Sequence, residues 1–163
     1  MKILVISDTH IPNRAKELPK KVLDEIKGVD MVVHAGDFTS FNFYLELRAL
    51  SPSLKAVRGN MDDEDIYDTL PEKLTFEVEG LKFGLTHGFG APFGIEKRVV
   101  AMFDGSDIDL LIFGHTHRAT DKVFQGIHLF NPGSPTDRLF APRRSYGLIE
   151  VDKGKIETRI VYI

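Results

Sequence analysis

The amino-acid sequence predicts an α/β protein in which two packed mixed β-sheets carry helices on their outer faces. The first part of the chain alternates short apolar runs with helical patterns, which is typical of parallel strands joined by helical crossovers. The middle contains a hairpin pattern, and the remainder reads as antiparallel strands joined by tight turns. The 163 residues contain no repeat, linker or low-complexity tract, so we expect one domain over 1–163.

Three apolar runs and two helical patterns alternate in the first part of the chain. The first run, Met-Lys-Ile-Leu-Val-Ile, has the character of a strand buried on both faces. In the first helical pattern, Pro19 suits a first turn and Gly28 suits a C-terminal stop. We expect strands over 1–6, 30–35 and 54–57, and helices over 17–27 and 42–50.

The pattern changes in the second part of the chain. Glu79-Gly80 separates two apolar segments as in a hairpin, and a loop rich in glycine and proline precedes another helical pattern. The segments beyond His117 read as antiparallel strands. We expect a helix over 95–103, and strands over 74–78, 81–86, 108–113, 119–124, 127–130, 145–151 and 156–161.

Composition limits the functions that the chain can have. The formal net charge is -3, so no general basic field attracts nucleic acid or an anionic membrane, and a nucleic-acid polymer is not expected as a partner. The absence of cysteine removes disulfides, thiolate metal ligands and cysteine nucleophiles. Without a signal-peptide pattern or an apolar run of about 20 residues, we expect a cytoplasmic protein with no membrane partner. A homodimer is the default expectation for its oligomeric state.

Polar residues follow the apolar runs where the predicted strands end. Asp8 and His10 come after the first run, one residue apart, so both project from the same side of an extended chain. Such strand ends are where α/β proteins place their chemistry. Later strand ends add the candidates Asp37, Asn60, His87, His115 and His117.

Together these residues offer more oxygen and nitrogen ligands than the three or four that one catalytic zinc ion takes from protein. They suit two cations about 3.5–4 Å apart with one bridging carboxylate. Such a pair clamps a phosphate group and lowers the pKa of a shared water. Asn60 would contribute an oxygen without negative charge, which leaves more positive charge facing an anionic substrate.

The motifs Asp8-x-His10, Gly36-Asp37, Gly59-Asn60, His87 and Gly114-His115-x-His117 resemble those of the calcineurin-like metallophosphoesterases. Their order and strand-end placement match, and the similarity runs from Lys2 to the last strands. The brevity of the chain and its Asn-Pro-Gly-Ser stretch at 131–134 resemble the small bacterial and archaeal phosphodiesterases of that superfamily. The resemblance implies a four-layer α/β/β/α sandwich with a dinuclear site at the sheet ends.

The resemblance also implies the function and the ligands. One metal would be held by Asp8, His10, Asp37 and His117, and the other by Asp37, Asn60, His87 and His115, with Asp37 bridging. A metal-bridging hydroxide would attack the phosphorus of a small phosphodiester or nucleotide. Manganese (Mn²⁺) is the favoured cofactor, with Ni²⁺, Co²⁺, Fe or Zn²⁺ as possible occupants.

One position departs from the family pattern. Many members read Gly-Asn-His, where the histidine contacts the phosphate and can protonate the leaving group, whereas this chain has Met61 after Asn60. Methionine cannot donate a proton. We therefore expect a diesterase that prefers activated leaving groups, with Asp37, Asn60 and Asp62 as catalytic residues. Asp62 or a metal-bound water would replace the missing acid.

Other readings of single residues stay open. Asn60 also fits a turn residue after a glycine, and His87 also fits a strand-end histidine satisfied by backbone. Arg14 and Arg118 are candidate phosphate contacts, and the alternative is that both are ordinary solvated surface residues. We expect His34 to lie in the core or to support a metal ligand, and His128 to have a structural role. Most of the side chains of Phe38, Phe41, Phe43 and Phe89 are expected to pack in the core.

Three other functions compete with the phosphodiesterase. The first is a phosphomonoesterase or a pyrophosphatase that acts on nucleotides, against which the missing histidine is only a mild argument. The second is a protein-binding scaffold, since the same fold occurs with a degraded metal site in eukaryotic retromer. The third is a metal sensor or store, although an open dinuclear site suits tight storage poorly.

Overall fold

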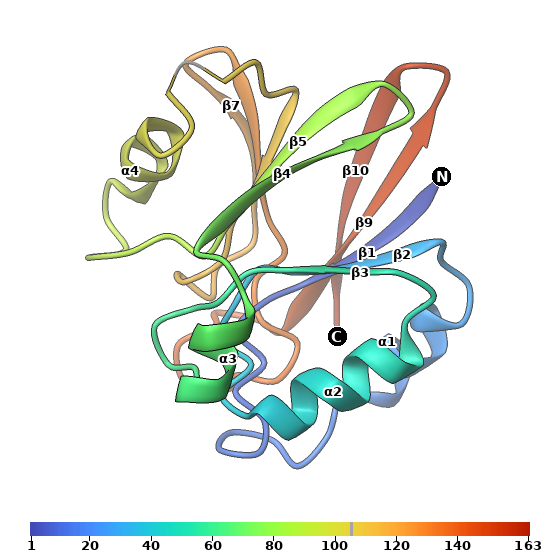
Figure 1. Ribbon diagram of the computed structural model, residues 1–163, viewed down its shortest axis with the longest axis vertical. Helices are drawn as coiled ribbons and strands as arrows, with labels where there is room; N and C mark the ends of the chain where they lie inside the picture. Colours follow the sequence, from blue (N-terminus) through green and yellow to red (C-terminus); the bar gives the residue numbers. More distant parts are fainter. Residues whose placement is uncertain (105) are drawn as a thin grey trace.

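The computed structural model describes residues 1–104 and 106–163, and it consists of two five-stranded sheets packed face to face between helices (Figure 1). Helices α1, α2 and α3 lie along one sheet, and α4 lies on the other. This is the predicted four-layer α/β/β/α sandwich. No helix among the described residues has the length and apolar character needed to cross a membrane.

The first sheet has the strand order β10-β9-β1-β2-β3. Its strands are β1 (Lys2–Ile6), β2 (Met31–His34), β3 (Leu54–Ala56), β9 (Ser145–Asp152) and β10 (Lys155–Tyr162). Strands β1, β2 and β3 pair in parallel, and β9 runs antiparallel to β1. The parallel centre follows from the predicted strand-helix alternation of the first part of the chain.

The second sheet has the order β4-β5-β6-β8-β7. Its strands are β4 (Lys73–Val78), β5 (Leu81–Thr86), β6 (Leu110–Ile112), β7 (Thr120–Phe124) and β8 (Ile127–Asn131). The expected hairpin joins β4 to β5. The antiparallel expectation is correct for β7 with β8, whereas β8 and β6 pair in parallel, an arrangement that the sequence analysis did not predict. The cause is the hairpin, because β7 forms the sheet edge and returns β8 to a place beside β6.

The helices are α1 (Lys20–Ile26), α2 (Phe41–Leu50), α3 (Glu64–Thr69) and α4 (Ile95–Ala101). Helix α1 starts later than predicted because Pro19 has an extended ψ of 139° and forms the N-cap. The sequence analysis missed α3. Its N-cap Asp63 accepts a hydrogen bond from Ile66 N at 3.0 Å, and only six residues are helical, too few for an apolar period to be visible.

Three apolar clusters fill the spaces between the layers. The middle one packs the inner faces of both sheets together, with Val5 and Val33 from one sheet against Phe83 and Ile112 from the other. Each outer cluster buries helix side chains against one sheet. Because β1 is covered on both faces, its residues from Ile3 to Ile6 are fully buried, which explains why the run is apolar at successive positions.

The strands deliver the polar candidates at their carboxyl ends. Asp8 follows β1, Asp37 follows β2 and Asn60 follows β3, and all three parallel strands end at the same edge of the first sheet. In the second sheet, β5 is followed by His87, and β6 by Gly114-His115-Thr116-His117. The two packed sheets therefore gather their functional loops at one place.

Candidate metal centre

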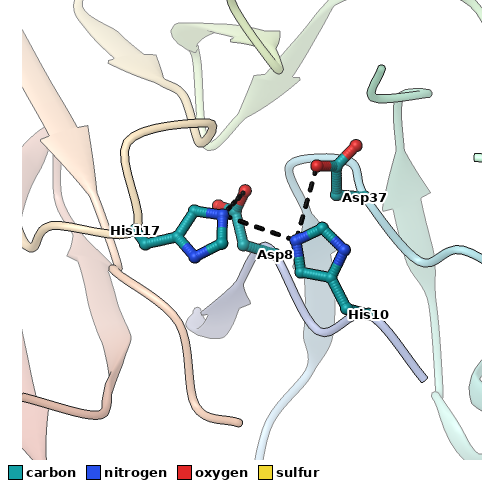
Figure 2. Close-up of side chains that lie close together, drawn as sticks. All are labelled: Asp8, His10, Asp37 and His117. Atoms are coloured by element: carbon teal, nitrogen blue, oxygen red, sulfur yellow. Dashed lines mark hydrogen bonds and ion pairs between the residues drawn. The ribbon is translucent and has the colours of Figure 1, made fainter. Parts of the chain in front are cut away.

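Four of the predicted ligands form a buried cluster. One donor atom from each of Asp8, His10, Asp37 and His117 lies within 4.8 Å of the others (Figure 2). His117 Nε2 lies 3.3 Å from Asp8 Oδ1, and His10 Nε2 lies 3.4 Å from His117 Nε2. Atoms so close and so rich in lone pairs could all reach a single cation.

The two oxygens of Asp8 have different surroundings. Oδ2 accepts hydrogen bonds from Ser7 Oγ at 2.6 Å and from the backbone N–H of His115 at 3.1 Å. Oδ1 is buried, and within the part of the chain that the structure describes it has no hydrogen-bond partner. A buried carboxylate oxygen without a partner is costly. A cation bound in the cluster would satisfy Oδ1, so the residues fit a metal.

The other three predicted ligands lie on the far side of Asp37. His87 Nε2 is 3.4 Å from Asp37 Oδ2 and 3.2 Å from Asn60 Oδ1. His115 Nδ1 lies 2.9 Å from the same Asn60 oxygen. Because Asp37 Oδ2 also lies 3.5 Å from His10 Nε2, one carboxylate oxygen faces both groups of ligands.

Backbone carbonyls fix the tautomers of two imidazoles. His87 Nδ1 donates to the carbonyl oxygen of Ala35 at 2.7 Å, and His115 Nε2 donates to that of Gly90 at 2.6 Å. In a neutral ring, the nitrogen opposite the donor carries the lone pair. In both residues that nitrogen faces Asn60. In metal sites, a hydrogen bond from the other ring nitrogen orients a histidine ligand in the same way.

The other two imidazoles have side-chain partners. His117 Nδ1 donates to Asp137 Oδ2, and His10 Nδ1 lies 3.3 Å from Thr39 Oγ1. The remaining ring nitrogens, both Nε2, point at the cluster. All four rings are thus held from behind with a nitrogen directed at the candidate metal positions.

The backbone around the cluster is strained. Among the residues that the structure describes, nine that are not glycine have positive φ angles, and six of them are in the loops of the cluster. These six are Asp8, His10, Asp37, Thr39, His115 and His117. Left-handed conformations are uncommon for residues other than glycine and gather at functional sites. The remaining three lie in the tight turns between paired strands, where such angles are ordinary.

Burial and charge compete in the cluster. Burial alone would lower the pKa of His87, but its hydrogen bond to Asp37 and the charges of Asp8 and Asp37 raise that pKa to about 9. Burial would raise the pKa of Asp37, but the hydrogen bond and charge of His87 and the Met61 amide lower it to about 2. The carboxylates therefore create a negative potential that attracts cations, and a bound cation would release the proton of His87.

The comparison with protein families decides the classification. The model of the calcineurin-like phosphoesterase superfamily domain matches residues 1–154. The chain belongs to this superfamily. It is 40% identical over 162 residues to a probable metallophosphoesterase of Methanothermobacter thermautotrophicus, covering 99% of this chain and 92% of that protein. A second probable metallophosphoesterase, from Methanocaldococcus jannaschii, is 38% identical over 164 residues, with 100% of this chain and 82% of that protein covered.

Solved structures with the same fold agree with this classification. Chaetomium thermophilum Vps29 superposes with a TM-score of 0.82 at 26% identity, covering 100% of this chain and 97% of that chain. Vps29 of Entamoeba histolytica complexed with zinc has a TM-score of 0.77 at 28% identity, with 99% of each chain covered. An archaeal phosphodiesterase shares the fold, with a TM-score of 0.74 at 24% identity over 99% of this chain and 100% of that chain.

The loop after Asn60 holds Asp37 in place. Gly59 packs so closely against Asp37 that a Cβ atom on it would lie 2.1 Å from Asp37 Oδ1. The backbone N–H of Met61 donates to that oxygen at 2.8 Å, and the Met61 side chain is 53% exposed. Asp62 accepts the N–H groups of Gly59 at 2.6 Å and Thr39 at 2.7 Å. Through these contacts Asp62 holds the loop in place, and that it replaces the missing acid stays a prediction.

The two candidate arginines have different surroundings. Arg14 Nη1 pairs with Asp137 Oδ2 at 3.0 Å, and its guanidinium lies 4.8 Å from the ring centre of Phe140. Arg14 therefore supports Asp137, the partner of His117, and its phosphate contact stays a prediction. Arg118 is exposed and lines a pocket of about 570 Å³ that reaches Thr116, the residue between His115 and His117 in the chain.

The remaining candidates lie where the sequence analysis expected. His34 is buried, stacks on Phe38 with ring centres 3.5 Å apart, and lies 3.0 Å from Thr9 Oγ1. His128 pairs with Asp121 at 2.7 Å, away from the cluster. The aromatic side chains at 38, 41 and 43 pack in the core under α2, whereas Phe89 is 49% exposed and lines a second pocket, of about 240 Å³, beside Asn60 and His87.

The sequence analysis missed the support that the 131–137 segment gives. Asn131 donates to the carbonyl oxygen of Gly114 at 2.8 Å, and Ser134 Oγ donates to that of Asp8 at 2.7 Å. Asp137, although charged, is 1% exposed, and the backbone N–H of Leu139 together with the hydrogen bond and charge of His117 lowers its pKa to about 2 against the effect of burial. The only hint in the sequence was the polar run that follows Pro132-Gly133.

We expect Asp137→Asn to weaken metal binding about 10–100-fold, because His117 loses the carboxylate that fixes its tautomer. Titration calorimetry with Mn²⁺ on chelator-treated protein measures this. The matched control is Asp121→Asn, which removes a carboxylate that pairs with a histidine, His128, away from the cluster. Equal affinity in both variants and the parent protein would show that Asp137 does not act on the metal centre.

Proposed function

We propose that the protein is a metal-dependent phosphodiesterase that hydrolyses a small phosphodiester or nucleotide at a dinuclear centre. The observation that carries this proposal is the position of Asp37 Oδ2, 3.5 Å from His10 Nε2 and 3.4 Å from His87 Nε2. One oxygen faces both ligand groups, as a bridging carboxylate does between two ions.

One ion would be held by Asp8, His10, Asp37 and His117, and the other by Asp37, Asn60, His87 and His115. The unpartnered Oδ1 of Asp8 and the absence of sulfur ligands fit divalent cations of hard or borderline character. Mn²⁺ is our first choice, and the zinc complex of a Vps29 structure supports Zn²⁺ as an alternative beside Ni²⁺, Co²⁺ and Fe. When bound, such a pair supplies Lewis-acid stabilisation of phosphate charge and a water of lowered pKa.

The chain itself orients the ligands and leaves one side open. Asn60 is exposed, so the edge of the cluster that it borders is accessible to a phosphate group from solvent. In hydrolysis the oxygen of water bonds to phosphorus, one ester P–O bond breaks, and the leaving oxygen takes up a proton. Met61 has no acidic proton to give. Both oxygens of Asp62 accept backbone N–H groups, but burial raises the pKa of this carboxyl. That Asp62 or a metal-bound water gives the proton stays a prediction.

A protein-binding scaffold is the second candidate, and the likeness to Vps29 structures supports it. The seven converging ligands argue for the enzyme, because a scaffold has no physical need for strained loops that aim four imidazoles at one place. The two functions differ in whether turnover depends on metal.

The test is hydrolysis of 4-nitrophenyl diesters and monoesters by chelator-treated protein titrated with Mn²⁺, Ni²⁺ and Zn²⁺. We expect metal to restore turnover of the diester and the diester to be preferred over the monoester. Preference for the monoester would identify a phosphomonoesterase instead. Protein that binds metal but hydrolyses neither substrate would favour the scaffold.

A further inference from the structure

The loop before α4 displays an aromatic ring beside the metal centre. Phe93 is 94% exposed, although its backbone is held firmly. Arg98 of α4 donates from Nε to the carbonyl oxygen of Phe89 at 2.8 Å, from Nη1 to that of Phe93 at 3.3 Å, and from Nη2 to that of Ala91. An anchored loop with an exposed Phe at its end presents a surface on which a planar group can stack.

The same loop contacts the metal centre directly. Gly90 gives the carbonyl oxygen that holds His115 Nε2 at 2.6 Å. A pocket of about 570 Å³ runs from Phe93 to Thr116 and Arg118, over the buried ring of Phe113. That volume is within the range of small-molecule sites, roughly 300–1,000 Å³. Through Thr116 and Arg118, the neighbours of His117 in the chain, this pocket borders the loop that carries two of the predicted metal ligands.

One of the charged side chains that line the pocket is paired within the described chain, and the other is not. Glu96 is neutralised by Lys122 Nζ at 2.6 Å. The guanidinium of Arg118 makes no hydrogen bond or ion pair with any residue that the structure describes. The pocket thus offers an aromatic face and one uncompensated positive charge that suits phosphate oxygens.

We propose that this pocket is the subsite for a phosphorylated nucleoside, so that the substrate is a linear dinucleotide carrying a second, terminal phosphate. Phe93 stacks on the base, and Arg118 binds the terminal phosphate while the bridging phosphate is at the metals. A cyclic mononucleotide leaves Arg118 without a partner, because its single phosphate is the one that is cleaved. This inference rests on the proposed phosphodiesterase function and names its substrate class.

The test compares three diesters with the Mn²⁺-loaded protein: thymidine dinucleotide with a 5′-phosphate, the same dinucleotide without it, and methyl 4-nitrophenyl phosphate. We expect Arg118→Gln to raise KM about tenfold for the phosphorylated dinucleotide alone. Phe93→Ala should raise KM about tenfold for both dinucleotides. Neither variant should change kcat for the methyl ester. Arg48→Gln and Leu50→Ala, exposed on α2, are the matched controls.

Equal KM values of the parent protein for the two dinucleotides would overturn the proposal, as would an Arg118→Gln effect on all three substrates. If the parent protein shows no metal-dependent turnover of the methyl ester, that result would instead count against the phosphodiesterase function. In that case the subsite is tested by binding alone, with calorimetry of thymidine 3′,5′-bisphosphate on the chelator-treated protein. Binding that Arg118→Gln weakens about tenfold supports the subsite, and unchanged binding refutes it.

Discussion

Asp37→Asn is expected to lower metal-dependent diester hydrolysis on the order of 10³-fold and to reduce the bound metal from two ions per chain to one. Asp37 Oδ2 is the atom shared by the two ligand groups, so losing its charge removes a ligand from both. Asparagine keeps the size of the side chain, and its carbonyl oxygen can still accept the N–H of Met61. Elemental analysis of the purified variant measures the metal content per chain, and kcat with a 4-nitrophenyl diester measures the loss of activity.

Asn60→Ala should act in the same direction but on one ion only, because Asn60 Oδ1 lies beside His87 and His115 and not in the first group. The control is Asp68→Asn, which removes a carboxylate from the exposed side of α3. Full metal content together with low activity in Asp37→Asn would contradict a bridging role. Full activity would contradict the dinuclear centre itself.

The strand-end motifs could be predicted because topology brings them together. Parallel strands β1, β2 and β3 end at one sheet edge, so Asp8, Asp37 and Asn60 had to meet once the order of strands and helices was known. The four layers were predictable for a similar reason, since apolar runs such as 1–6 need cover on both faces.

Contacts between loops were not predictable in this way. Asp137 comes after the last strand of the second sheet, and nothing in its neighbourhood shows that the chain turns back to bring it beside His117. Helix α3 is set by a single cap at Asp63, and the parallel place of β8 depends on which sheet edge β7 takes. Each of these depends on tertiary packing rather than on local pattern.

Met61→His is expected to raise the rate on diesters with alkyl leaving groups by about 10²-fold, at the low end of what a general acid contributes. Residue 61 follows Asn60 directly, and its backbone N–H is fixed to Asp37 Oδ1 at 2.8 Å. The side chain is 53% exposed, so an imidazole can replace it without disturbing the core. In many superfamily members a histidine occupies this position, which the resemblance assigns to phosphate contact and protonation of the leaving group.

Diesters with a 4-nitrophenyl leaving group should respond little, because that leaving group departs without a proton. The measurement is kcat/KM for matched alkyl and aryl diesters in the parent protein, Met61→His and Met61→Leu. Leucine controls for the loss of methionine without adding an acid. The parent protein should strongly prefer the aryl ester, and only the histidine variant should narrow that preference. Equal rates on both esters in the parent protein would mean that another group already supplies the proton, and the gain expected from Met61→His would vanish with it.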